Sequence, residues 1–170
     1  MPPADSASRA GVMPKVHGDR SSRTFATEMK MTIPQQIHAG ALPGAIISRT
    51  STHVAFLDHE PTAKGHVLVC PVKNVQSIFD LSRSEQADFL SFAGDVERLI
   101  RRALKPQGIS QIMNDGLFNE LGHLHLHLIP RYLDDGFSWI TPNCRPHSLT
   151  ELNEIAKQIR ESEQDVTPNA

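Results

Sequence analysis

Three histidines alternate with leucines in the segment 122–131, and this row restricts the fold more than any other feature of the chain. Successive side chains of a β-strand point to opposite faces. The leucines therefore need a core on one side, while the histidines share the other side at steps of about 7 Å. The pattern predicts a strand over 124–129. Three adjacent imidazoles add little stability, since charged rings repel and buried neutral rings each need a partner. The row of His123, His125 and His127 therefore predicts a functional site.

Two kinds of chemistry fit this row. Alternate histidines on a strand can grip zinc, because neutral imidazole is a good ligand. The neighbouring sequence offers no dedicated cysteine or carboxylate ligands to complete such a set, and Asp134 and Asp135 lie beyond a chain turn. A neutral imidazole, with an ordinary pKa of about 6.5, can instead attack phosphorus while a backbone carbonyl holds its other nitrogen. The residues alone leave metal binding and phosphorus chemistry both open.

The rest of the chain alternates short apolar runs with turn residues and two helical patterns. The clearest helix begins at a capping box of Ser82 and Glu85, carries one apolar stripe, and ends before Pro106. A second helical pattern covers 149–159. Strands are predicted at 46–47, 54–57, 66–70, 109–113 and 124–129. This order predicts an α+β fold with an antiparallel sheet and two main helices.

Length and composition limit the organisation of the chain. The 170 residues fit one domain, with residues 1–24 as a disordered leader, 25–162 as the domain and 163–170 as a flexible tail. A net charge of −2 gives no general attraction to nucleic acid or anionic lipid. No apolar run approaches the roughly 20 residues of a membrane span. Cys70 and Cys144 form no disulfide framework, which favours a reducing, cytoplasmic location.

Four segments together resemble one known family. Residues 123–129 read H-φ-H-φ-H-φ-φ, residues 54–61 contain "AFLD-x-x-P", residues 65–71 read "GH-x-L-V-x-P", and residues 112–116 end in "N-x-G". In this order and spacing the segments resemble the histidine triad (HIT) superfamily of nucleotide hydrolases and transferases. The resemblance implies the HIT-like antiparallel sheet with two main helices, and a homodimer.

The resemblance also implies catalytic roles. His125 corresponds to a nucleophile that forms a covalent nucleotidyl-histidine. His127 corresponds to a residue that touches the phosphate and assists the leaving group. His123 and His66 correspond to a supporting hydrogen-bond network. This chemistry is complete without a metal ion or any other cofactor.

A nucleotide-binding set follows from the same resemblance. Asp58 matches a position that binds ribose hydroxyls, where a carboxylate can accept two hydrogen bonds, although a loop or capping aspartate explains this residue equally well. Asn114 matches an amide on the phosphate side. Asn119 stands in the segment whose family residues contact phosphate or substrate. With His127, these residues form the expected nucleotide-binding set.

The chain departs from the family pattern in three places. Residues 32–38 lack the cysteines that in many members join a histidine to bind structural zinc, so that zinc site is expected to be absent. Asn74 stands where many members have a histidine. Glu120 lies just before the triad, where a carboxylate beside phosphate is unfavourable unless it points away or pairs with a cation.

The expected function is hydrolysis or transfer at the α-phosphate of a purine nucleotide conjugate. The conjugate would be a dinucleoside polyphosphate or a nucleoside phosphoramidate. The sequence leaves two alternatives open. One is a metal-dependent hydrolase that uses the histidines as ligands. The other is a nucleotide-binding regulatory protein with negligible turnover.

Overall fold

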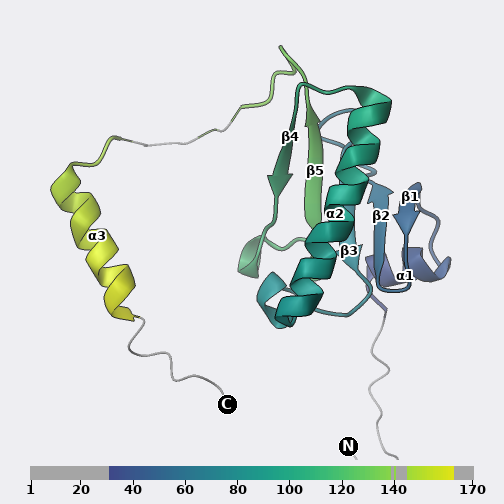
Figure 1. The fold of residues 1–170 in the computed structure, drawn as a ribbon, viewed down its shortest axis with the longest axis horizontal. Helices are drawn as coiled ribbons and strands as arrows, with labels where there is room; N and C mark the ends of the chain where they lie inside the picture. The colour runs from purple at the N-terminus through teal and green to yellow at the C-terminus, as the bar shows by residue number, and fades with distance from the viewer. Residues whose placement is uncertain (1–30, 139, 141–144, 163–170) are drawn as a thin grey trace, which may run out of the picture.

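A computed structural model describes residues 31–138, 140 and 145–162 of the chain. The predicted leader, the first residues of the predicted domain and the predicted tail lie outside these described residues. Within them, a twisted sheet is covered on one face by a long helix, and a short helix lies beside the sheet's β1 end (Figure 1). No helix in this part of the chain is long and apolar enough to cross a membrane.

The sheet has five strands, all paired in antiparallel fashion. The strands are β1 (Ile46–Arg49), β2 (His53–Leu57), β3 (Val67–Pro71), β4 (Gly108–Ile112) and β5 (Leu126–Arg131). Their spatial order is β1-β2-β3-β5-β4, so the triad strand β5 lies between β3 and β4. The predicted α+β class and antiparallel sheet are confirmed.

The long helix α2 (Arg83–Leu104) supplies most of the cover of the sheet. It begins at the predicted capping box, in which the Ser82 side chain accepts from the Glu85 backbone N–H. It ends at Lys105 in the left-handed conformation, with Pro106 following. The helix crosses one face of the sheet (Figure 1). Its apolar stripe packs against side chains of the strands that face it. The buried helix residues are Phe89, Phe92, Ala93, Val96 and Ile100.

The helix α1 (Ile33–Ala39) was not predicted, so the structure has one helix more than the two main helices that the sequence indicated. Seven residues are too few for a clear helical period. The signals that were present are local, namely a capping box between Thr32 and Gln35 and a proline in the first turn. Tertiary contacts hold this short helix, since Pro34 and Ile37 are buried.

The second predicted helix is present as α3 (Leu149–Glu161), again with a capping box at its start. None of its residues is buried, and it stands apart from the sheet in Figure 1. Two short 3-10 turns, Ile78–Asp80 and Gly116–Phe118, complete the described elements. The second turn comes soon after β4, in the connection that leads to the triad.

Candidate active site

The triad spans the start of β5 rather than its middle. The sequence predicted a strand over 124–129, whereas the ladder begins at Leu126, so His123 and His125 precede the paired residues. His127 is the only triad histidine inside the strand, opposite Leu68 of β3 and Ile112 of β4. His123 is fully buried and His125 is 1% exposed, whereas His127 is half-buried.

His125 is held by the backbone of its own row. Its Nδ1 lies 2.9 Å from the carbonyl oxygen of His123. A carbonyl oxygen only accepts, so Nδ1 must carry the proton and donate it. The neutral ring therefore keeps its lone pair on Nε2. The side chain lines the main pocket of the protein, which gives that lone pair access to a ligand.

His123 is locked between two segments that are distant in the sequence. Its Nε2 lies 2.8 Å from the carbonyl oxygen of Pro71, so Nε2–H donates there. Its Nδ1 is then an acceptor for the Thr32 hydroxyl at 3.0 Å, and the Gln35 Oε1 lies 3.2 Å from the same hydroxyl. Burial lowers the pKa of His123, which favours this neutral ring. The contacts fit the predicted supporting role, although nothing in the triad pattern indicated Thr32 as the partner.

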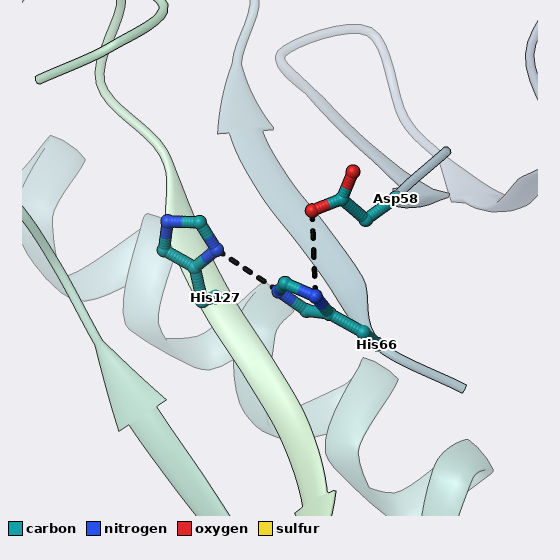
Figure 2. Close-up of side chains that lie close together, drawn as sticks. All are labelled: Asp58, His66 and His127. Atoms are coloured by element: carbon teal, nitrogen blue, oxygen red, sulfur yellow. Dashed lines mark hydrogen bonds and ion pairs between the residues drawn. The ribbon is translucent and has the colours of Figure 1, made fainter. Parts of the chain in front are cut away.

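His66 and His127 form a chain of side chains with Asp58 (Figure 2). The His66 Nε2 lies 2.9 Å from the His127 Nδ1. On its other side, the His66 Nδ1 accepts from the Thr62 backbone N–H at 3.2 Å and lies 3.3 Å from an Asp58 carboxylate oxygen. The Thr62 contact means that His66 Nε2–H donates to His127, which leaves the remaining proton of neutral His127 on its Nε2.

The electrostatic setting keeps these rings neutral in the free protein. Burial lowers the pKa of His127 to about 4, and repulsion from His125 and His66 adds to the effect, while the Asp58 carboxylate opposes it. Burial also lowers the pKa of His66, again with Asp58 acting in the opposite direction. The donors and acceptors in this chain of contacts can exchange roles. When His127 is charged, its Nδ1–H donates to His66, whose Nδ1–H then faces Asp58.

The pocket in front of the triad has a volume of about 1260 Å³. This exceeds the roughly 300–1,000 Å³ that small-molecule sites usually enclose. Part of its lining is apolar and comes from α1, the segment before β1, and β2. These residues are Ile33, Ile37, Leu42, Pro43, Ala45 and Phe56. The imidazoles of His66, His125 and His127 and the amide of Asn114 also line it. The pocket thus joins an apolar surface to a row of imidazoles.

The charged lining of the pocket is acidic. The carboxylates of Asp58, Glu60 and Glu120 all belong to it. Among the described residues that line the pocket, none is lysine or arginine. A ligand that carries several negative charges would meet three carboxylates without a permanent cation to offset them.

Asn119 is the one proposed nucleotide-binding residue that the structure does not bring to the pocket. Its Nδ2 donates to the carbonyl oxygen of Gln76 at 2.9 Å, and it is absent from the pocket lining. Its Oδ1 is buried and has no hydrogen-bond partner among the described residues. The side chain thus ties the segment before the triad to the turn after β3.

Glu120 and Asp58 each lie close to triad histidines. The sequence offered no dedicated set of cysteine or carboxylate ligands beside the triad, and the fold brings these two carboxylates to it. One oxygen of Glu120 and one nitrogen each of His125 and His127 lie within 4.8 Å of one another. Asp58, His66 and His127 form a second group of the same kind. Glu120 is three residues before His123, whereas Asp58 is distant from the triad in sequence and comes to it only through the pairing of the strands.

Fold and site together define an α+β protein of the histidine triad type, in which a five-stranded sheet presents two of three alternate histidines at one pocket and buries the third behind them. Comparison with known proteins agrees, since the HIT domain family matches residues 39–134. The chain belongs to the HIT domain family.

Similar proteins with assigned activities cover most of this chain. The adenosine 5′-monophosphoramidase hnt1 of Schizosaccharomyces pombe is 28% identical over 131 residues, which cover 74% of this chain and 96% of that protein. The asymmetrical bis(5′-nucleosyl)-tetraphosphatase of the same organism is 29% identical over 126 residues, covering 72% of this chain and 67% of the other. A crystal structure of a HIT family member from Bacillus subtilis superposes with a TM-score of 0.66 at 27% identity, covering 76% of this chain and 95% of that one.

Proposed function

We propose that this protein cleaves nucleotide conjugates at the α-phosphate through a covalent nucleotidyl-histidine on His125. The observation that carries the proposal is the hydrogen bond from His125 Nδ1–H to the His123 carbonyl, which leaves the Nε2 lone pair at the pocket. A neutral imidazole in that state is a nucleophile. Related proteins named as a phosphoramidase and a nucleosyl-tetraphosphatase support a nucleotide substrate.

The reaction has two steps. In the first, His125 Nε2 donates its electron pair to the α-phosphorus, the new P–N bond forms, and the bond to the leaving atom breaks. Protonated His127 gives its Nε2 proton to the leaving atom. In the second, water attacks the phosphorus, the P–N bond breaks, and His127 takes up the proton that water releases. His125 and His127 thereby return to their starting states.

His127 is neutral in the free protein at neutral pH. It must therefore take up the proton for the leaving group when the substrate binds. A bound phosphate anion raises the pKa of a neighbouring imidazole, which opposes the effect of burial. The Asp58 carboxylate acts in the same direction through His66. We propose that this chain, Asp58–His66–His127, stabilises the charged ring only while substrate is bound.

The pocket favours one class of substrate over another. The apolar part of the lining fits a purine base, and Asp58 at the pocket wall fits the ribose hydroxyls. A polyphosphate chain would bring several negative charges toward Asp58, Glu60 and Glu120. A nucleoside phosphoramidate has a single negative charge on phosphorus, so its amine leaving group meets less repulsion. We therefore propose phosphoramidates as the preferred substrates, and a homodimer as the active form.

Mass spectrometry of the protein quenched during turnover tests the mechanism. The protein is mixed with an adenosine phosphoramidate and denatured at neutral or basic pH, because the P–N bond is labile in acid. We expect one adenylyl group on the peptide that contains residues 123–131, and fragmentation should place it on His125. The His125→Ala protein should show neither the adduct nor turnover. An adduct on Cys70, or wild-type turnover by His125→Ala, would contradict the proposal.

A metal-dependent hydrolase is the second candidate, and the two groups of possible metal ligands favour it. Dialysis against a strong chelator separates the two mechanisms. We expect turnover to survive metal removal, because imidazole attack followed by water attack needs no Lewis acid. Loss of turnover that stoichiometric Zn²⁺ restores would support the second candidate. A protein that binds nucleotide but gives no product in a single-turnover assay would instead be a regulatory binding protein.

A further inference from the structure

We propose that Glu120, His125 and His127 form a binding site for one divalent transition-metal ion such as Zn²⁺, and that the bound ion stops catalysis. The binding does not depend on the proposed function, but its inhibitory effect rests on the role of His125 as nucleophile. This site differs from the structural zinc site expected to be absent, because residues 32–38 contribute nothing to it.

The distances suit a metal ion after a small movement. The three ligand atoms lie within 4.8 Å of one another. Neighbouring ligands around tetrahedral zinc are about 3.3 Å apart, since Zn–N and Zn–O bonds are about 2.0–2.1 Å long. Glu120 can make the adjustment, because its side chain is exposed and has no hydrogen bond or ion pair with any described residue. His125 is buried and held in place.

Both histidines already have the outer contacts that metal-binding histidines use. The other nitrogen of a metal ligand is usually held by a carbonyl oxygen or by a hydrogen-bonded carboxylate system. The His125 Nδ1 donates to the His123 carbonyl at 2.9 Å. The His127 Nδ1 contacts His66 at 2.9 Å, and His66 in turn faces Asp58 (Figure 2). These contacts occupy both Nδ1 atoms, so the Nε2 atoms are the ones left for a metal ion.

The second group of possible ligands, Asp58 with His66 and His127, is less suitable. Both nitrogens of His66 are already engaged, one by the Thr62 N–H and the other by His127. A metal ion bound to His66 would break at least one of these contacts, and His66 is buried, so the lost hydrogen bond would not be replaced by water. The Glu120 group keeps the contact between His66 and His127, with the proton now on the His127 Nδ1, and gives up only the Thr62 N–H contact of His66.

The donor set selects the type of ion. Two neutral imidazoles and one carboxylate suit Zn²⁺ and Co²⁺, whereas Mg²⁺ and Ca²⁺ prefer a shell of oxygen ligands. A metal ion at the His127 Nε2 requires the ring's proton to be on Nδ1, from which it donates to the His66 Nε2. Once bound, the ion occupies the lone pair of His125, which then cannot attack phosphorus.

Direct titration tests the site without relying on turnover. Tag-free protein is titrated with Zn²⁺ in a calorimeter and with Co²⁺ by visible absorption. Glu120→Gln removes the carboxylate ligand. Glu60→Gln is the matched control, because Glu60 lines the same pocket with the same charge but belongs to neither ligand group. The loss of an outer contact alone weakens metal binding 10–100-fold, so Glu120→Gln should weaken it by about 100-fold, and Glu60→Gln should leave it close to wild type.

Parallel assays then test the inhibitory effect. We expect Zn²⁺ to inhibit hydrolysis of an adenosine phosphoramidate at the concentration that half-saturates the site, and Glu120→Gln to need correspondingly more. Absence of saturable one-to-one binding, or equal binding by the Glu120→Gln and Glu60→Gln proteins, would overturn the site. Binding with undiminished or faster turnover would overturn the inhibitory effect. The proposed function fails by a different result, namely the absence of a nucleotide adduct on His125, so the two failures can be told apart.

Discussion

Replacing Thr32 with valine should destabilise the protein and disturb the position of His125, although Thr32 does not contact His125 itself. Thr32 donates its hydroxyl proton to the Nδ1 of His123 at 3.0 Å, and His123 is fully buried. Valine has nearly the same shape but cannot donate, so a buried ring nitrogen loses its partner. An unsatisfied buried group costs about 1–3 kcal/mol, and we expect the free energy of unfolding to fall by that amount.

Thr32→Val should also lower activity, because the backbone carbonyl of His123 holds the nucleophile His125. The carbonyl oxygen of His123 accepts from His125 Nδ1–H, so a shift of His123 misdirects the attacking Nε2. Thr32 is not among the residues that line the pocket. Thr32→Val should therefore lower kcat more than it changes KM.

Urea denaturation at pH 7 and steady-state kinetics measure the two effects. Thr32→Ser keeps the hydroxyl and should stay close to wild type in both assays. Thr150→Val, at an exposed position of α3, controls for the general effect of the substitution. If Thr32→Val and Thr150→Val were equally stable and equally active, the hydrogen bond from Thr32 would have no role in positioning the triad.

Three further predictions follow from other contacts. Asp58→Asn should lower the ratio of kcat/KM for ribonucleotide over deoxyribonucleotide substrates, because the charged carboxylate that accepts from the ribose hydroxyls becomes a neutral amide. An unchanged ratio would make Asp58 a structural residue. Gly65→Ala should lower the thermal unfolding temperature, because a Cβ there would lie 2.2 Å from a Leu104 methyl group. Gly136→Ala is also at positive φ but has open space around the Cβ, so its unfolding temperature should fall clearly less. Equal falls in the two variants would refute the clash. The free energy of unfolding should fall as pH drops from the ordinary histidine pKa of 6.5 to about 4, because the unfolded chain takes up a proton that the half-buried His127 does not. Urea titrations of His127→Asn should show a smaller fall, and a fall equal to wild type would contradict the assignment.

The sequence by itself determined the features that depend on local spacing. The alternation of histidine and leucine was sufficient to predict a strand with a functional row, since side chains of a strand alternate wherever it lies. The capping box at Ser82 and the stripe that follows it predicted α2. The resemblance of the spaced motifs predicted the family, which the HIT domain match to residues 39–134 confirms.

Only the tertiary structure decided how the site is held and charged. Thr32 and His123 are 91 positions apart, and Pro71 is 52 positions from the same ring, so no local pattern could pair them. Asn119, expected at the nucleotide, turns to the Gln76 carbonyl instead. The physical reason is common to these cases. Local preference and side-chain periodicity act over a few residues, whereas partners for buried polar groups are chosen by the packing of segments that the sequence keeps far apart.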